Sequence, residues 1–273
     1  MLSISELEKK SRDIRVDILK MVTEAGSGHP GGSLSATDIL VTLYNNVLRH
    51  DPKNPDWEER DRFILSKGHA APLLYAVLAD QGYISQTCLP TLRDLGSILQ
   101  GHPVCEKVKG VEVSTGSLGN GLSIGAGLAA AARINNAKWR VYVLLGDGEC
   151  DEGTVWEGAM FAAHYRLGNL TAIIDRNGLQ IDGPTEQVMG LNPLPEKWRA
   201  FNWNVIEVDG HKHKELLKAF DEAIKPQNRP SVIIANTVKG KGVSYMEGNV
   251  SYHGKVPSKP DLEKALKELG VHE

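Results

Sequence analysis

Apolar residues near the start of the chain recur with the period of a helix. They lie three or four residues apart, with Ser11 in the one polar step, and this spacing predicts an amphipathic helix over residues 4–25. Ser3 followed by Glu6 has the sequence of a capping box at its beginning. The glycines and proline of the stretch 26–32 are expected to break the helix. The apolar positions are Ile4, Leu7, Ile14, Ile18, Met21 and Ala25.

Later in the chain, short apolar runs alternate with helical patterns. After a second apolar helix, expected from about Ala36 to Leu48, each run is followed by a turn and a helix, and the last helix is expected from about Pro260 to Gly270. Strands that alternate with helices predict a parallel sheet with helices on both faces, an α/β fold in one domain over residues 1–273. The runs are Phe63–Leu65, Val141–Leu145, Leu170–Ile174, Val205–Val208 and Val232–Ala235. The helix between the second and third runs is expected to bury Val155, Trp156, Ala159, Met160 and Ala163.

Composition excludes several classes of protein. The chain has 273 residues with 41% hydrophobic and 24% charged residues, which is ordinary for a globular protein. A net charge of −3 argues against nucleic-acid binding, although Lys239 and Lys241 are possible anion contacts. No apolar run reaches the roughly 18 residues of a membrane helix. An odd number of cysteines, three, fits neither a disulfide framework nor a zinc site. We therefore expect a cytoplasmic protein with reduced thiols and no membrane partner.

Two polar segments follow neighbouring strands of the predicted sheet. Gly146-Asp147-Gly148 comes directly after the second run, and Asn177 follows the third. Ligands of parallel sheets bind at the carboxyl ends of the strands, so both side chains are expected in one crevice. Carboxylate and amide oxygens suit Mg²⁺, and flanking glycines let backbone amides approach an anion. The alternative for Gly-Asp-Gly alone is a tight turn without a ligand.

Histidines beside glycines form the second candidate feature. An imidazole next to a glycine is expected on a tight loop rather than inside a helix or strand. Near neutral pH such a ring can donate, accept or transfer a proton. Four of the nine histidines directly follow a glycine and a fifth precedes one; they are His29, His69, His102, His211 and His253.

The sequence segments around these residues resemble motifs of the transketolase family. Gly146-Asp147-Gly148 with Asn177 is similar to the GDG…N fingerprint of thiamine diphosphate enzymes. The other matching segments are Ser27-Gly28-His29-Pro30-Gly31, Ser66-Lys67-Gly68-His69-Ala70, Gly101-His102-Pro103, Val113–Gly121 and Tyr252-His253-Gly254. They keep the family's order from about residue 10 to residue 270, so the chain resembles the N-terminal, diphosphate-binding part of a transketolase.

The resemblance implies a role for each matching residue. Asp147, Asn177 and the backbone carbonyl of Leu179 would hold Mg²⁺, or Ca²⁺ or Mn²⁺, which in turn holds thiamine diphosphate. His69 and His253 would contact the diphosphate and nearby substrate, whereas His29 and His102 would bind the donor sugar. The remaining cofactor contacts implied are Gly116, Leu118, Gly146, Gly148 and Ile181. Nothing in the resemblance assigns His211, which is expected to be structural or at the surface.

Several features of the resemblance concern assembly and substrates. Glu152 matches a glutamate that lies between paired active sites in transketolases. Ser117 and Asn120 replace the family's proline and glutamine near the cofactor, which leaves the substrate range open. The small residues of the segment 116–132 fit a homodimeric contact, or equally a helix packed on the chain's own sheet.

A partner chain is also implied. In transketolases a carboxylate of a second, pyrimidine-binding domain activates the cofactor, and that domain lies beyond the matching region. We therefore expect a separate C-terminal subunit, an assembly of two copies of each chain, and no activity in this chain alone. The expected reaction transfers a two-carbon ketol unit from a ketose phosphate to an aldose phosphate, as in the pentose phosphate pathway.

Other functions are considered as alternatives. The chain could be half of a deoxyxylulose phosphate synthase-like or dihydroxyacetone synthase-like enzyme, or a non-catalytic scaffold that binds the cofactor. Gly119-Asn120-Gly121 followed by Gly125 has the wrong spacing for a dinucleotide-binding loop, and no Walker A sequence is present.

Overall fold

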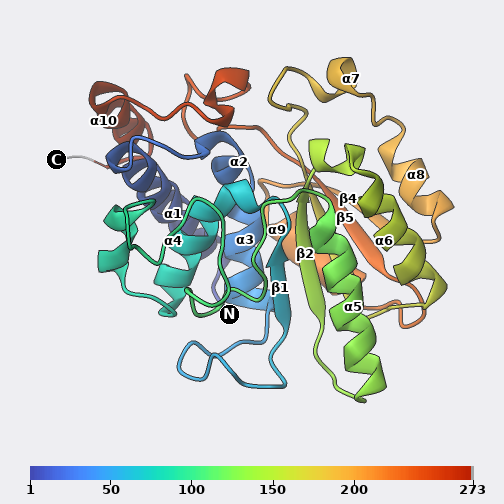
Figure 1. Ribbon diagram of the computed structural model, residues 1–273. Helices are drawn as coiled ribbons and strands as arrows, with labels where there is room; N and C mark the ends of the chain where they lie inside the picture. The colour runs from blue at the N-terminus through green and yellow to red at the C-terminus, as the bar shows by residue number, and fades with distance from the viewer. Residues whose placement is uncertain (272–273) are drawn as a thin grey trace.

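A five-stranded parallel sheet forms the centre of the molecule. The computed structural model describes residues 1–271, and its strands follow the order β1-β2-β3-β5-β4 with every neighbouring pair parallel (Figure 1). The strands are β1 (Arg62–Leu65), β2 (Val141–Gly146), β3 (Leu170–Arg176), β4 (Asn204–Asp209) and β5 (Ser231–Asn236). Each predicted apolar run lies inside one of these strands, so the predicted parallel sheet is confirmed.

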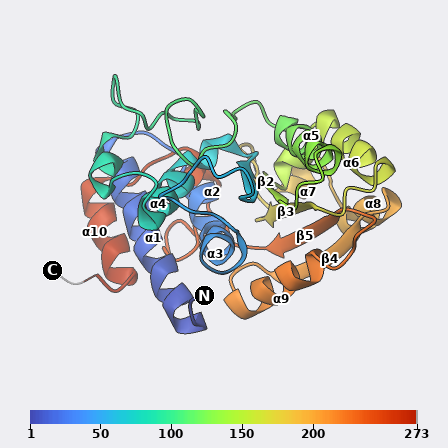
Figure 2. The same ribbon diagram turned by 90° about the horizontal axis from the view of Figure 1, so that it is seen from below.

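Helices cover both faces of the sheet (Figure 2). Strand residues alternate between two hydrophobic clusters: Phe63 and Leu65 pack with the helices of one face, and Ile64 with those of the other. The first face is covered mainly by α1 (Ile4–Glu24), α3 (Thr37–Thr42), α4 (Ala71–Gln81) and α9 (His213–Ala223), and the second by α5 (Asn120–Ile134), α6 (Gly153–His164) and α8 (Leu194–Ala200). The remaining elements are α2 (Pro30–Ser35), α7 (Thr185–Val188), α10 (Lys259–Glu268), η1 (Leu43–Val47), η2 (Gly68–Ala70), η3 (Gln86–Thr91), η4 (Gly148–Asp151) and η5 (Val250–His253). Burial of the strands on both faces explains their continuous apolar sequence.

The N-terminal segment differs from its prediction in one respect. The capping box of α1 is confirmed, since Ser3 and Glu6 bond each other's backbone amides. The stretch 26–32 breaks the first helix as expected, since α1 ends at Glu24, but a short helix that the sequence did not predict, α2, begins at Pro30. Proline is tolerated at the first helical position because its missing N–H has no partner there. The predicted helix 36–48 consists of α3 and the π-turn η1.

The buried face of α6 also differs from its prediction. Val155 and Ala159 are fully buried as expected, but Met160 is 52% exposed. The packed positions include Gly158, where an added Cβ would lie 2.9 Å from the Ser123 hydroxyl of α5. The buried face of α6 therefore runs through Val155, Gly158, Ala159 and Ala162, and Met160 lies outside it. The expectation that the segment 116–132 packs on the chain's own sheet is correct for one side of α5, which lies on β2.

The sheet brings three loops to one edge. Gly146 at the end of β2 lies opposite Asp175 of β3, and Asp175 lies opposite Ala235 of β5. The residues that follow these strands therefore meet at the carboxyl edge.

Within residues 1–271 no helix is both long and apolar enough to cross a membrane.

Candidate functional site

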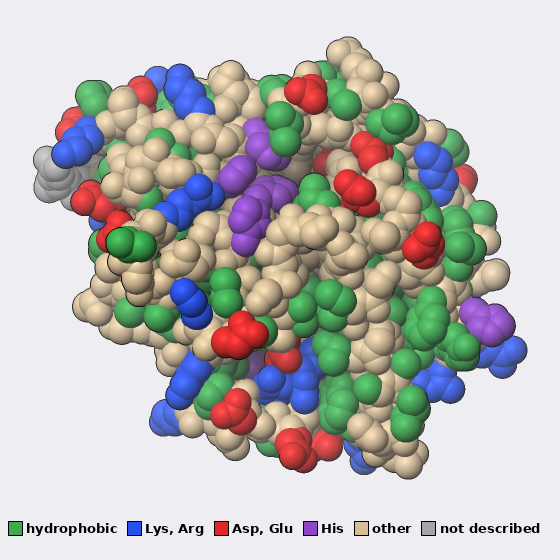
Figure 3. All heavy atoms as spheres, in the orientation of Figure 1, with side chains coloured by type: hydrophobic (Ala, Val, Ile, Leu, Met, Phe, Trp, Pro, Cys, Tyr) green, Lys and Arg blue, Asp and Glu red, His purple; other side chains and the backbone are tan. Residues whose placement is uncertain are grey.

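A cleft of about 390 Å³ lies at the carboxyl edge of the sheet. Figure 3 shows histidine side chains beside this hollow and acidic side chains on its other side. The predicted site residues that line it are His29, His69, Gly116, Leu118, Gly146, Asp147, Gly148, Glu152, Asn177, Leu179, Ile181 and His253. Segments far apart in the sequence are therefore brought together as predicted. His102 is the exception: it is exposed, and its ring lies against the backbone of Gly116, 3.1 Å from where a Cβ there would stand.

Asp147 stands at the closed end of the cleft. The residue is 3% exposed, and its carboxylate accepts hydrogen bonds from the N–H groups of Gly148 at 2.9 Å and Gly178 at 2.6 Å. Burial and the nearby Asp175 carboxylate raise the pKa of Asp147 to about 6. A cation beside this carboxylate would relieve the cost of its burial, so its environment suits a metal ligand.

Two further oxygen atoms lie on the loop after β3. The side-chain oxygen of Asn177 accepts a hydrogen bond from the N–H of Leu179 at 3.1 Å, and the carbonyl of Leu179 accepts one from the Lys239 ammonium at 2.9 Å. A carboxylate, an amide oxygen and a backbone carbonyl are the hard ligands that Mg²⁺ prefers. Among the described residues no three His, Cys, Asp or Glu side chains gather as a metal-binding group. The donor set therefore fits a cation that also takes oxygen atoms from its ligand.

Asp175 organises the inner wall of the cleft. Its fully buried carboxylate accepts hydrogen bonds from the Lys67 ammonium at 2.5 Å, from Ser35 at 2.5 Å and from Asn177 at 3.1 Å. Thr237 also donates to it. Burial alone would raise the pKa of Asp175, but Lys67 and these hydrogen bonds outweigh burial and lower it. Asp175 thus holds Asn177 in place without facing the cleft.

Lys239 brings a positive charge into the site. The residue is only 3% exposed, and its ammonium donates to the carbonyl of Leu179 at 2.9 Å and to Nδ1 of His253 at 2.8 Å. Burial and the neighbouring Lys67 lower the pKa of Lys239 to about 8, although the carboxylates of Asp147 and Asp175 act in the opposite direction. A buried ammonium in the lining of the cleft suits contact with phosphate oxygens.

Three histidines form a compact group on one wall of the cleft. The ring centroids of His29, His69 and His253 lie 5.2 to 5.5 Å apart. Burial, with help from nearby cations, lowers the pKa of His29 to about 4, of His253 to about 3, and of His69 well below its usual range. All three rings are therefore neutral at pH 7 and can donate or accept hydrogen bonds. Nδ1 of His29 is buried and has no hydrogen-bond partner within the described chain.

The outer rim has a different character. Ile181 is 67% exposed, and Glu152 is exposed beside Gly119. Beneath the rim, the buried carboxylate of Glu149 accepts hydrogen bonds from the N–H groups of Gly119 at 2.9 Å and Gly146 at 3.0 Å. Glu149 therefore ties the segment before α5 to the end of β2, which shapes one wall of the cleft.

Sequence reasoning missed several of these residues. Lys67 and Asp175 lie within two residues of the predicted site residues His69 and Asn177, and Glu149 directly follows Gly148. The sequence presents Lys239 only as a possible anion contact, and its burial in the structure decides its role. The signal that could have found them is a charged residue at a strand end inside an apolar context, where a partner is obligatory.

Comparisons with known proteins agree with this geometry. A family model described as "Transketolase, thiamine diphosphate binding domain" matches residues 7–273. The chain is 44% identical over 268 residues to an apulose-4-phosphate transketolase subunit of Phocaeicola vulgatus, covering 98% of this chain and 95% of that protein. It is 42% identical over 264 residues to the 6-deoxy-6-sulfo-D-fructose transketolase subunit SqwG of a Clostridium species, covering 97% and 96%.

Solved structures give the same result. The fold matches the crystal structure of transketolase from Campylobacter jejuni with a TM-score of 0.94 and 35% identity. That match covers 98% of this chain but only 43% of the longer one. The family model matches nearly the whole chain, and the cleft lies at the expected edge of the sheet. The chain therefore belongs to the transketolase family and corresponds to the N-terminal, thiamine diphosphate-binding part of a transketolase.

Proposed function

We propose that the cleft binds thiamine diphosphate through a divalent cation, with Mg²⁺ as the resident ion and Ca²⁺ or Mn²⁺ as substitutes. The side chains of Asp147 and Asn177 and the carbonyl of Leu179 would hold the cation. The observation that carries the proposal is the buried Asp147 carboxylate, fixed by two backbone amides beside Leu179 and Lys239. The Lys239 ammonium, which lines the cleft, would offset part of the negative charge of the diphosphate.

When bound, thiamine diphosphate supplies a carbon nucleophile that cleaves and forms carbon–carbon bonds next to a carbonyl group. The chain's own histidines serve the sugar around it. His29 and His102 would bind hydroxyl and carbonyl oxygens of the donor, and His69 and His253 would contact the diphosphate and nearby substrate. The lowered pKa values of His29 and His253 support this assignment, since a neutral ring can accept a hydroxyl proton.

The cofactor's other end requires a partner chain. Gly116, Leu118 and Ile181 would lie along the cofactor, and Ile181 and Glu152 face outward at the rim. We infer that a C-terminal subunit covers this rim and supplies the carboxylate that activates the cofactor, in an assembly of two copies of each chain. Two similar proteins are themselves named as transketolase subunits, and this chain spans 43% of the C. jejuni transketolase.

The reaction we propose is transfer of a two-carbon ketol unit from a ketose phosphate to an aldose phosphate. Relatives are named for apulose 4-phosphate and for a sulfonated fructose, so phosphorylated or sulfonated sugars are the substrate class. We propose a cytoplasmic location and a place among pentose phosphate interconversions. The three free cysteines support the location.

Reconstitution tests the proposal. The purified chain is mixed with candidate C-terminal transketolase subunits, thiamine diphosphate and Mg²⁺, and ketol transfer between a ketose phosphate and an aldose phosphate is measured. Activity from the mixture, with none from either chain alone, supports the proposal. Cofactor binding without turnover in every pairing would instead favour a non-catalytic scaffold. Condensation of pyruvate or transfer to formaldehyde would identify a deoxyxylulose phosphate synthase-like or dihydroxyacetone synthase-like enzyme.

A further inference from the structure

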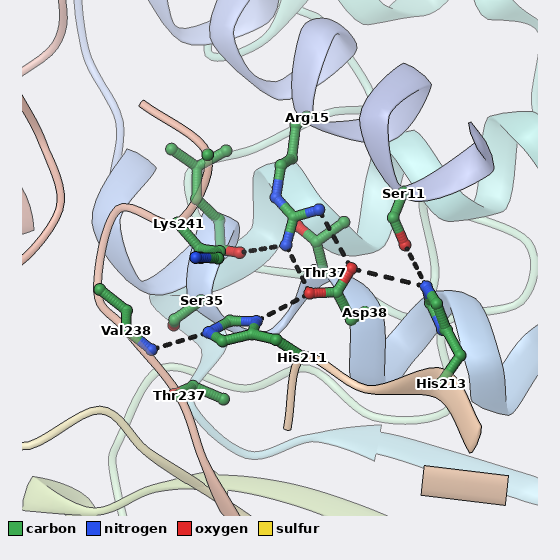
Figure 4. A network of polar contacts seen from close by, with 12 residues as sticks. Ser11, Arg15, Ser35, Thr37, Asp38, His211, His213, Thr237, Val238 and Lys241 are labelled. Carbon is green, nitrogen blue, oxygen red and sulfur yellow. Dashed lines mark hydrogen bonds and ion pairs between the residues drawn. The ribbon is translucent and has the colours of Figure 1, made fainter. Parts of the chain in front are cut away.

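A buried polar network lies behind the cleft, between α1, α3 and the turn after β4 (Figure 4). We call it the Asp38 network; its members are Arg15, Asp38, His211 and His213. Arg15 and Asp38 are 6% and 5% exposed, and two Arg15 nitrogens donate to the two carboxylate oxygens at 3.0 Å and 2.6 Å. Burial opposes ionisation of Asp38, but Arg15 and His211 overcome it and hold the pKa of Asp38 well below its usual range.

His211 connects the Asp38 network to the loop after β5. Its Nδ1 lies 2.8 Å from Oδ2 of Asp38, and its Nε2 lies 2.8 Å from the backbone nitrogen of Val238. A backbone N–H can only donate, so Nε2 is the acceptor and the ring proton of His211 is on Nδ1, where it donates to Asp38. The carboxylate therefore fixes both the orientation and the tautomer of a ring that holds a backbone amide.

The residue after Val238 is Lys239, whose ammonium lies in the cleft. Thr237 is bonded to Asp175, and the N–H of Gly240 donates to the carbonyl of Gly31 at 3.1 Å. Between these two anchors, the N–H of Val238 is held by the ring of His211. The Lys239 side chain is only 3% exposed and its ammonium has two partners, so packing restricts its path and a shift of the backbone would displace the ammonium.

We propose that His211, oriented by Asp38 and Arg15, is a positioning residue that fixes the loop after β5 and so sets the Lys239 ammonium beside Leu179 and His253. His211 is not among the residues that line the cleft, and it acts through the Val238 amide. Only the identity of the ligand, a diphosphate, rests on the proposed function. Supporting groups of this kind govern how well a binding group is placed.

Two amide substitutions separate the two contacts of the ring. In His211→Gln the side-chain oxygen can occupy the place of Nε2 and keep the Val238 contact. In His211→Asn the side chain reaches only the place of Nδ1, so it can still donate to Asp38 but cannot hold Val238. His213→Asn is the matched control, because His213 bonds Ser11 at 3.2 Å and Thr42 at 2.7 Å in the same network without touching the loop.

The first measurement needs no ligand. Each full-length variant is treated briefly with an amine-reactive reagent, and labelling of Lys239 is measured by mass spectrometry. We expect labelling of Lys239 to rise about fivefold or more in His211→Asn, the effect of about 1 kcal/mol of lost local stability. His211→Gln and His213→Asn are expected to remain within about twofold of the wild type.

The second measurement is calorimetry with Mg²⁺ and inorganic pyrophosphate. The His211→Asn variant is expected to bind Mg²⁺-pyrophosphate about tenfold more weakly than the wild type.

The outcomes distinguish this inference from the proposed function. Unchanged Lys239 labelling in folded His211→Asn, or equal labelling increases in His213→Asn, overturns the inference. If His211→Asn does not fold, His211→Ala, which also removes the Val238 contact, replaces it: raised labelling there with wild-type labelling in His211→Gln supports the inference, and equal labelling in the two variants overturns it. If the wild type binds no pyrophosphate while Lys239 labelling changes as expected, the inference stands and the proposed diphosphate site fails.

Discussion

The two ends of the cleft are built differently. At the inner end Lys67, Asp147, Asp175 and Lys239 are between 0% and 3% exposed, and each makes hydrogen bonds to other parts of the chain. At the outer rim Ile181 is 67% exposed, and Glu152 is also exposed. Charges are buried at one end and an apolar side chain is left in water at the other.

This difference indicates which interactions the chain completes by itself. Buried charges are tolerated only when paired and hydrogen-bonded, so the inner end must be fixed when the chain folds. Burial of the exposed Ile181 side chain under another protein surface would be energetically favourable, because apolar surface would leave water. The inner end is therefore fixed before any ligand binds, which suits the proposed diphosphate and metal site, whereas the rim fits the proposed contact with a partner subunit.

The largest expected effect comes from breaking the buried pair of Lys67 and Asp175. Lys67→Met leaves a carboxylate buried without its ammonium, and we expect a loss of about 3–5 kcal/mol in the free energy of unfolding, measured by denaturant titration. Arg199→Met is the control, because Arg199 pairs with Glu196 and Glu207 at the exposed surface and is expected to cost about 1 kcal/mol or less. Equal losses of unfolding free energy in Lys67→Met and Arg199→Met would contradict the claim that Lys67 and Asp175 form a buried pair at the inner end.

A smaller effect is expected from His29 as a function of pH. The pKa of His29 is about 4 in the folded protein, below its ordinary value of 6.5. The folded state therefore binds this proton less readily than the unfolded state, and stability is lost as pH falls from about 6.5 towards 4. Because the ring is partly exposed, we expect a contribution on the order of 1–2 kcal/mol.

The measurement is the free energy of unfolding at pH 7 and pH 4.5. His29→Gln should lose less stability between these values than the wild type, whereas His164→Gln, on the exposed surface of α6, should behave like the wild type. If His29→Gln is as sensitive to acid as the wild type, the ring is not buried as a neutral group.

The smallest effect on the isolated chain is expected at the rim. Glu152→Gln should change the free energy of unfolding and the affinity for Mg²⁺-pyrophosphate by less than about 0.5 kcal/mol, since the side chain is exposed. In the reconstituted assembly the same variant should lower ketol transfer. If the variant instead bound pyrophosphate more weakly as an isolated chain and kept full activity after reconstitution, Glu152 would act in ligand binding and not at the contact with the partner subunit.

The sheet and the outline of the site could be predicted from the sequence because both depend on local patterns. Short continuous apolar runs located all five strands, and glycines at strand ends located Asp147 and Asn177. The partners of charged residues were not predictable, because pairs such as Lys67 with Asp175 join positions far apart in the chain. The buried face of α6 was also misplaced, because it includes Gly158, which has no apolar side chain to mark it, and excludes Met160.

The proposed roles of individual site residues remain predictions. The structure brings the cleft-lining set together, but His102 lies outside the lining, at the backbone of Gly116. Its predicted contact with the donor sugar requires a substrate that extends beyond the cleft. His211 was expected to be structural or at the surface, and its two bonded ring nitrogens agree with a structural role.

Calorimetry of cofactor binding tests the central claim most directly. Thiamine diphosphate is titrated into the reconstituted assembly with and without Mg²⁺, for the wild type, Asp147→Ala and, as a control, Asp182→Ala, which alters an exposed acid of the same cleft. We predict that Asp147→Ala weakens Mg²⁺-dependent binding by about a hundredfold or more, while Asp182→Ala stays within about twofold of the wild type. Unchanged Mg²⁺-dependent binding in Asp147→Ala would contradict the account.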